Sequence, residues 1–173
     1  MGNEKSLVVN KNAPLLSICI PTYKRPEIID MLLESIVSQE VDKDLYEICI
    51  TDNSTTDETA DLIHAKYSDV VNLRYKKTTC EGFLNSVEAL HFGNGAYIKL
   101  HNDYSIFNPG SIQKMIDRIK ETDSEDSYIY FSFGSVKDAS DINSFNSYDE
   151  FMRFIKYGGH KSDHRSTVGG LVA

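Results

Sequence analysis

The sequence predicts an α/β fold in which helices cover both faces of a mostly parallel β-sheet. First, short apolar runs that suit buried strands alternate along the chain with segments whose apolar residues recur at helical spacing. Second, each of the first four strand candidates is followed by a helix candidate, which is the connection that parallel strands need. Third, 173 residues, 40% of them hydrophobic, suffice for one globular domain.

The first strand is expected at Leu15–Ile20, and the first helix runs from Pro26 to about Gln39. The strand candidate is apolar except for one serine, and Pro21 is expected to end it. Pro26 suits the first turn of a helix, where its missing amide hydrogen is not needed. Behind it, one helical face is apolar: Ile28, Ile29, Leu32, Leu33, Ile36 and Val37.

The second strand is expected at Tyr46–Thr51, and the second helix at about Asp57–Tyr67. Isoleucines flank Cys49 in this strand candidate, as they flank Cys19 in the first, so both cysteines are expected to be buried thiols. The hydroxyl side chains just before the helix are candidates for its cap: Ser54, Thr55 and Thr56.

The third unit consists of a strand at Val70–Tyr75 and a helix at Gly82–Phe92. Gly93-Asn94-Gly95 is typical of a helix end followed by a turn, and Ala96–Leu100 is expected as the fourth strand. Pro109–Lys120 is predicted as the next helix because a proline stands near its start and four apolar residues follow at helical spacing.

The last part of the chain is expected to hold two strands and a short helix. The strands are predicted at Tyr128–Phe133 and Thr167–Val172, and the helix at Tyr148–Ile155. Residues 134–147 are rich in Ser, Asp and Asn and are predicted as a loop, whereas residues 1–14 are expected to form a flexible leader.

The charge balance argues against a nucleic-acid partner, because 26 acidic residues outweigh 18 basic ones and give a net charge of −8. No apolar run approaches the ~20 residues that cross a bilayer, and no signal-peptide core opens the chain. We therefore expect a cytoplasmic protein. Six basic residues within 153–165 are either a solvated face or a contact with the donor diphosphate or with an anionic lipid-linked acceptor. The last of these would place the protein peripherally at the inner face of the cell membrane.

Polar and aromatic side chains follow three of the predicted strands, and ligands of open parallel sheets bind at the strands' carboxyl ends. Pro21–Pro26 presents an aromatic ring and two cations, Asp52–Thr59 is dense in hydrogen-bond acceptors, and His101–Tyr104 follows the fourth strand. An aspartate after the second strand can accept a hydrogen bond from a base. A carboxylate after the fourth can hold a divalent cation that bridges two phosphates. The layout predicts a nucleoside-diphosphate pocket.

Three segments together resemble the family 2 inverting glycosyltransferases with the GT-A fold: Leu16–Pro26, Ile50–Thr59 and Gly95–Asp103. The resemblance covers about residues 15–120. It implies an enzyme that transfers a sugar with inversion from a nucleotide-diphosphate donor to an acceptor hydroxyl, often in bacterial surface-polysaccharide synthesis. The acceptor would be a saccharide or a lipid-linked saccharide, and the donor nucleotide (UDP, GDP, CDP or dTDP type) stays open.

The resemblance also implies roles for residues at the strand ends. Carried over by position, Asp52 would hydrogen-bond the base and Asp103 would face the metal and the diphosphate. The other residues of the implied nucleotide site are Pro21, Thr22, Tyr23, Asn53, Gly82, Asn85 and Asn102.

The metal motif departs from the family pattern of two or three aspartates, because only Asp103 carries a carboxylate in His101–Ser105. The implied cofactor is Mn²⁺ or Mg²⁺. His101 could add a nitrogen ligand, or it could be a polar residue at a strand end with no metal role.

Inverting transfer needs a general base, normally a carboxylate, to take the proton of the acceptor hydroxyl. In the resembled family this residue lies beyond the last recognisable strand. Asp163 is the only carboxylate in the final twenty residues that could serve. We therefore expect residues 15–173 to be a GT-A-type nucleotide-sugar-binding domain truncated at its C-terminus.

Two other functions fit parts of the sequence. A catalytically silent nucleotide-sugar-binding domain would explain the reduced aspartate motif and the missing base. A sugar nucleotidyltransferase would need a glycine-rich loop after the first strand, and Pro21–Pro26 contains no glycine.

Overall fold

The computed structural model describes residues 13–121, 128–130 and 170–172. The chain divides into two compact units, residues 1–129 with 170–173 and residues 130–169, and all four described helices lie in the first. The elements in chain order are β1 (Leu16–Thr22), α1 (Pro26–Val37), β2 (Tyr46–Asp52), α2 (Glu58–Tyr67), β3 (Leu73–Lys77), α3 (Leu84–Phe92), β4 (Tyr97–Leu100), α4 (Ser111–Lys120), β5 (Tyr128–Tyr130) and β6 (Gly170–Val172).

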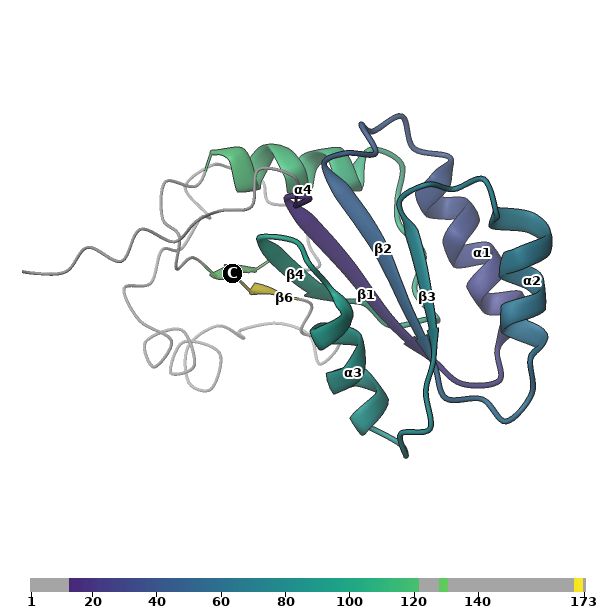
Figure 1. Ribbon diagram of the computed structural model, residues 1–173. Helices are drawn as coiled ribbons and strands as arrows, with labels where there is room; N and C mark the ends of the chain where they lie inside the picture. The colour runs from purple at the N-terminus through teal and green to yellow at the C-terminus, as the bar shows by residue number, and fades with distance from the viewer. Residues whose placement is uncertain (1–12, 122–127, 131–169, 173) are drawn as a thin grey trace, which may run out of the picture. The chain divides into compact units, whose positions relative to one another are not determined.

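The sheet has the strand order β3-β2-β1-β4-β6-β5, and β1 to β4 pair in parallel (Figure 1). β6 pairs antiparallel with β4, through Ile98 with Val172 and Lys99 with Leu171. The predicted fold class, a mostly parallel sheet in an α/β chain, is therefore confirmed.

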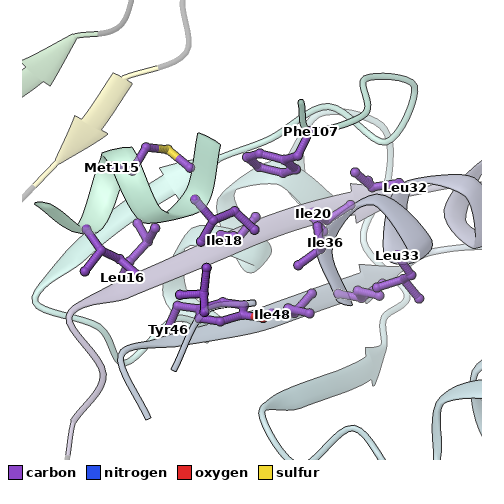
Figure 2. Packing of buried hydrophobic residues seen from close by; sticks show 14 of the residues in the cluster. Leu16, Ile18, Ile20, Leu32, Leu33, Ile36, Tyr46, Ile48, Phe107 and Met115 are labelled. Carbon is purple, nitrogen blue, oxygen red and sulfur yellow. The ribbon is translucent and has the colours of Figure 1, made fainter. Parts of the chain in front are cut away.

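Helices cover both faces of the sheet, as predicted. The larger core lies on the face of α1 and α4, where Leu16 and Ile18 of β1 lie opposite Met115 and Ile20 lies near Ile36 (Figure 2). On the other face α3 packs against the buried thiols of β1 and β2. Both central strands are thus buried on both faces, which explains their apolar sequences.

Of the four parallel strands, β1 and β3 have boundaries that differ from the prediction by two residues or more. β1 continues through Pro21 to Thr22, because its pairing with β4 ends at Cys19 while its pairing with β2 extends to Thr22. The amide hydrogen that proline lacks is therefore not needed for a bond to β4. β3 starts at Leu73 instead of Val70, since the amide of Leu73 closes a turn on the Val70 carbonyl at 3.0 Å.

The helix starts differ as well. α3 begins at Leu84, after Gly82 with a φ of 50°, and α4 begins at Ser111, after Gly110 with a φ of 75°. The predicted cap of α2 was wrong, because Asp57 stands at the cap position without a capping side-chain hydrogen bond. Ser54 instead bonds to Asp52. The predicted helix at 148–155 lies outside the described residues.

A buried carboxylate, Glu47, ties the amino ends of the central strands together. It accepts hydrogen bonds from the Ser17 hydroxyl at 2.6 Å, the Asn94 amide at 2.5 Å and the Arg74 guanidinium at 2.9 Å. The amide of Gly95 in turn donates to the Ser17 hydroxyl at 2.7 Å. A side chain at Gly95 would place its Cβ 2.6 Å from the backbone nitrogen of Ser17, so the turn into β4 needs glycine here.

Among the described residues, no helix is both long and apolar enough to span a bilayer.

Candidate functional site

The parallel register brings the predicted site residues to one edge of the sheet. Thr22 at the end of β1 pairs with Asp52 at the end of β2, and Asp52 pairs with Lys77 at the end of β3. β4 ends at Leu100, so His101–Tyr104 follow it at the same edge. The loops after β1, β2, β3 and β4 therefore leave the sheet side by side, and they include the three predicted from the sequence.

Asp52 is fully buried, and both of its carboxylate oxygens accept hydrogen bonds. Oδ1 accepts from the amide of Ser54 at 2.8 Å and from the Ser54 hydroxyl. Oδ2 accepts from the Tyr75 hydroxyl at 2.9 Å and lies 3.9 Å from the Lys77 ammonium. Burial and the bond to Asp52 raise the pKa of Tyr75 well above its usual value, so its hydroxyl stays a donor. Asp52 therefore joins β2, β3 and the loop after β2.

The Ser54 hydroxyl extends this network to the loop after β1. It accepts a hydrogen bond from the amide of Lys24 at 2.7 Å. Lys24 has a φ of 54°, in the left-handed region that a lysine seldom occupies, and this bond helps to hold it there. Its ammonium lies 5.1 Å from the centre of the Tyr23 ring, which is half exposed at this edge. Tyr23 is thus accessible to a ligand.

Asn85 of α3 holds the ends of β1 and β2 together from beneath the edge. Its amide donates to the carbonyl of Thr51 at 3.0 Å and to that of Thr22 at 3.3 Å. Its carbonyl oxygen accepts from the Thr78 hydroxyl at 2.9 Å. Asn53, which also lies within hydrogen-bonding distance of Asn85, donates to the Cys80 carbonyl at 2.8 Å. Asn85 is buried, so its described contacts are with protein groups.

Asp103 lies beside the end of β1, with only 8% of its side chain exposed. One carboxylate oxygen accepts from the Thr22 hydroxyl at 2.9 Å, and the other pairs with the Arg25 guanidinium at 3.0 Å. The Arg25 side chain is 47% exposed and lies 5.9 Å from the Tyr104 ring. The predicted metal carboxylate is therefore already paired with a cation of the chain itself.

His101 makes contacts that differ from those of a metal ligand. Its ring stacks on Phe107 with centroids 4.2 Å apart, and its Nε2 lies 2.6 Å from the Ser105 carbonyl. Burial lowers the pKa of His101 to about 4, so the ring is neutral at pH 7 and Nε2 donates to that carbonyl. Within residues 13–121 and the two short described segments, no three His, Cys, Asp or Glu side chains form a metal-binding group.

The other predicted residues fall into two sets. Pro21 and Asn102 are partly buried at the edge, and Gly82 is exposed in the loop after β3. Asp163 and the basic residues of 153–165 lie outside the described residues, so these predictions stay predictions.

The sequence did not reveal three residues of the site: Arg25, Ser54 as a hydrogen-bond donor to Asp52, and Tyr75. For Arg25 a signal was present, since it belongs to the cationic turn after the first strand. Tyr75 could have been found from the sheet period, because it stands two residues before the end of β3 and so shares a face with Lys77.

Three comparisons relate the chain to known proteins. The model of the family described as glycosyl transferase family 2 matches residues 17–166. The abequosyltransferase RfbV of Salmonella typhimurium is 36% identical over 86 residues, which are 48% of this chain and 26% of the relative. Among solved structures, residues 1–349 of TarS from S. aureus align with a TM-score of 0.55 and 25% identity over 61% of this chain and 32% of theirs.

Ligands are present in some of the similar structures. TarS was also solved in complex with UDP-GlcNAc and with UDP. The mannosyltransferase PcManGT of Pyrobaculum calidifontis, in complex with GDP-Man and Mn²⁺, shares the fold with a TM-score of 0.52 at 19% identity over 64% of this chain and 32% of its own. The chain thus spans about a quarter to a third of the length of these proteins.

Proposed function

The chain belongs to glycosyl transferase family 2, and we propose that it binds the nucleotide-sugar donor of a sugar transferase at the carboxyl edge of its sheet. The observation that carries the proposal is the joint placement at that edge of Thr22, Asp52 and Asp103 within the family match. The UDP-GlcNAc bound to TarS and the GDP-Man bound to PcManGT support a nucleotide sugar as the ligand.

The proposed reaction is a single displacement with inversion at the anomeric carbon of the donor sugar. The acceptor hydroxyl attacks that carbon, a carboxylate base takes the hydroxyl's proton, and the nucleoside diphosphate leaves with the bonding electron pair. Asp163 stays the proposed base.

A saccharide or lipid-linked saccharide of a bacterial surface polysaccharide is the proposed acceptor. A location in the cytoplasm, with peripheral membrane contact, also stays a proposal.

At the base end of the pocket, Tyr23 supplies an exposed ring and Asp52 supplies carboxylate oxygens. A carboxylate oxygen has two lone pairs, so Oδ2 can accept a bond from a base while it keeps that from Tyr75. Because Asp52 is fully buried, the base must displace neighbouring side chains to reach it. Lys77 is the exposed neighbour whose ammonium is 3.9 Å away.

One similar structure supports the proposed divalent cation, whereas the contacts of Asp103 and His101 argue against it. Mn²⁺ in PcManGT supports it, and Mg²⁺ or Mn²⁺ in such sites takes most of its ligands from phosphate and water. However, both oxygens of Asp103 are engaged by Arg25 and Thr22, and His101 is bonded to Ser105. The described residues therefore do not form a ready metal site.

Calorimetric titration with UDP, GDP, CDP and dTDP, each with and without Mn²⁺, tests the proposed function. One of them is expected to bind, and Asp52→Asn is expected to weaken that binding about 10- to 100-fold, because a hydrogen bond to a charged group is lost. Tyr75→Phe is the matched control, since it removes a bond to Asp52 but leaves the carboxylate.

Equal losses in the two variants would show that Asp52 acts by holding the loops and not by contacting the base. No binding of any of the four diphosphates would contradict the proposed function. Binding without sugar transfer to any acceptor would instead favour a silent binding domain or the donor-binding part of a longer transferase.

A further inference from the structure

We propose that Arg25 contacts and neutralises the diphosphate of the bound donor, and that Asp103 is the residue that positions it. The inference rests on the proposed function. It concerns a residue to which neither the sequence pattern nor the comparisons give a role, and it assigns to a side chain of this protein the charge that the sequence resemblance assigns to a metal ion.

The first step is the geometry of the pair. The Asp103 carboxylate is nearly buried, whereas almost half of the Arg25 side chain is exposed. Guanidinium carries five N–H donors, and among the described residues Asp103 is its only hydrogen-bond acceptor, through Nη1 at 3.0 Å. The pair thus anchors one side of the guanidinium and leaves other donors available to a ligand at the edge of the sheet.

The second step is that several contacts fix the direction of the guanidinium. The Thr22 hydroxyl donates to the second oxygen of Asp103 at 2.9 Å, so the carboxylate cannot rotate freely. The Tyr104 ring centre lies 5.9 Å from the guanidinium carbon. A charge held in this way costs less side-chain entropy when it binds a ligand than a free surface arginine does.

The third step is the chemistry of the ligand that fits. A planar guanidinium matches two oxygens of a phosphate and can donate a hydrogen bond to each of them. Arg25 also stands at the cap position of the twelve-residue helix α1, whose amino end carries partial positive charge. An anion is therefore favoured at this position, and the anion of a nucleotide-sugar donor is its diphosphate.

The fourth step compares Arg25 with a metal ion. A divalent cation that bound Asp103 would lie close to the guanidinium, which is 3.0 Å from one of the carboxylate oxygens, and a metal ion and the guanidinium repel each other. No cluster of three metal-ligating side chains is found in the described part of the chain to compensate. The positive charge already present beside Asp103 is Arg25.

The test uses the full 173-residue chain, the nucleoside diphosphate that binds most tightly, and its parent nucleoside, all in EDTA. Arg25→Gln is expected to weaken diphosphate binding about 10- to 100-fold and to leave nucleoside binding unchanged. Asp103→Asn is expected to weaken diphosphate binding in the same selective way, and Arg25→Lys is expected to restore part of it. Arg118→Gln is the matched control: Arg118 is 40% exposed and ion-paired with Glu121 on another part of the chain, and its loss is expected to have no effect.

Two outcomes would overturn the inference while the proposed function stands. One is that the original chain does not bind the diphosphate in EDTA, and that with Mn²⁺ the original chain and Arg25→Gln bind it equally tightly. The other is an equal loss of nucleoside and diphosphate affinity in Arg25→Gln, which would show a structural role. If the original chain binds no nucleoside diphosphate at all, the proposed function fails, and the inference fails with it.

Discussion

Replacing Glu47 with glutamine is expected to lower the free energy of unfolding at pH 7 by about 3 kcal/mol, because it removes the buried partner of a partly exposed ion pair together with an acceptor of several hydrogen bonds. Glutamine has one acceptor atom and one NH₂ group at its end, so either the Asn94 amide and the Ser17 hydroxyl or the Arg74 guanidinium would face a donor, and Arg74 would lose its carboxylate partner. Urea unfolding of the two proteins measures the difference.

The same substitution is expected to reduce the sensitivity of the fold to acid. Burial alone would raise the pKa of Glu47, but hydrogen bonds from Ser17, Asn94 and Arg74 outweigh it and lower the pKa below the usual 4.5. A carboxyl with a lowered folded-state pKa stabilises the fold above pH 4.5, and this contribution is lost as the pH falls through the folded pKa. The original chain should therefore lose more stability than Glu47→Gln between pH 5 and pH 3.

Glu88→Gln is the control for this pair of measurements, since Glu88 pairs with Lys76 on the surface of α3 and surface ion pairs contribute little. If Glu47→Gln were as stable as Glu88→Gln at pH 7, the hydrogen bonds of Glu47 would not hold the amino ends of the strands together.

Replacing Asn85 with leucine is expected to cost a similar amount, about 3 kcal/mol, and to weaken nucleotide binding as well. Leucine has a similar size but no polar atoms, so the carbonyls of Thr22 and Thr51 and the hydroxyl of Thr78 would each lose a hydrogen bond. The Thr22 carbonyl would keep the bond from the Asn53 amide. Each buried polar group left without a partner costs about 1–3 kcal/mol. Asn85 would then no longer hold the ends of β1 and β2 together. Because Thr22 also bonds to Asp103, the distance between Asp103 and Asp52 would no longer be fixed.

Thermal or urea unfolding and nucleotide titration measure the two effects of Asn85→Leu. Thr78→Val is a graded control, because it removes one of these bonds and should cost about 1 kcal/mol. A variant Asn85→Leu with unchanged stability would show that the hydrogen bonds of Asn85 do not determine how the strand ends are held.

The fold class could be predicted from the sequence because the main strands are buried on both faces. β1 and β2 lie between α3 and the pair α1 and α4, so most of their residues are apolar and the pattern is strong. The start of β3 was not predictable in the same way. Val71 is apolar yet 84% exposed, and the turn that precedes Leu73 is closed by backbone groups that no side-chain pattern reveals.

The positions of the site residues could be predicted, but their partners could not. A parallel sheet places the residue after each strand at one edge, whatever its identity, which brought Asp52 and Asp103 to the expected place. Their partners depend on distant residues and on side-chain direction: Arg25 is 78 positions from Asp103, and Tyr75 is 23 from Asp52. For this reason Asp103, to which the sequence resemblance gives a metal, is paired with Arg25 in the structure.

Several loop amides have side chains as their hydrogen-bond acceptors, and three of them lie at the two ends of the sheet: Lys24 donates to Ser54, Asn94 to Glu47 and Gly95 to Ser17. Loop amides usually exchange their hydrogens with solvent rapidly, so slow exchange at these three positions would report on the side-chain networks alone. Lys24 reports on the carboxyl edge, and the other two report on the opposite edge. A nucleotide bound as proposed should slow exchange at Lys24 and leave Asn94 and Gly95 unchanged, which locates the ligand without any substitution.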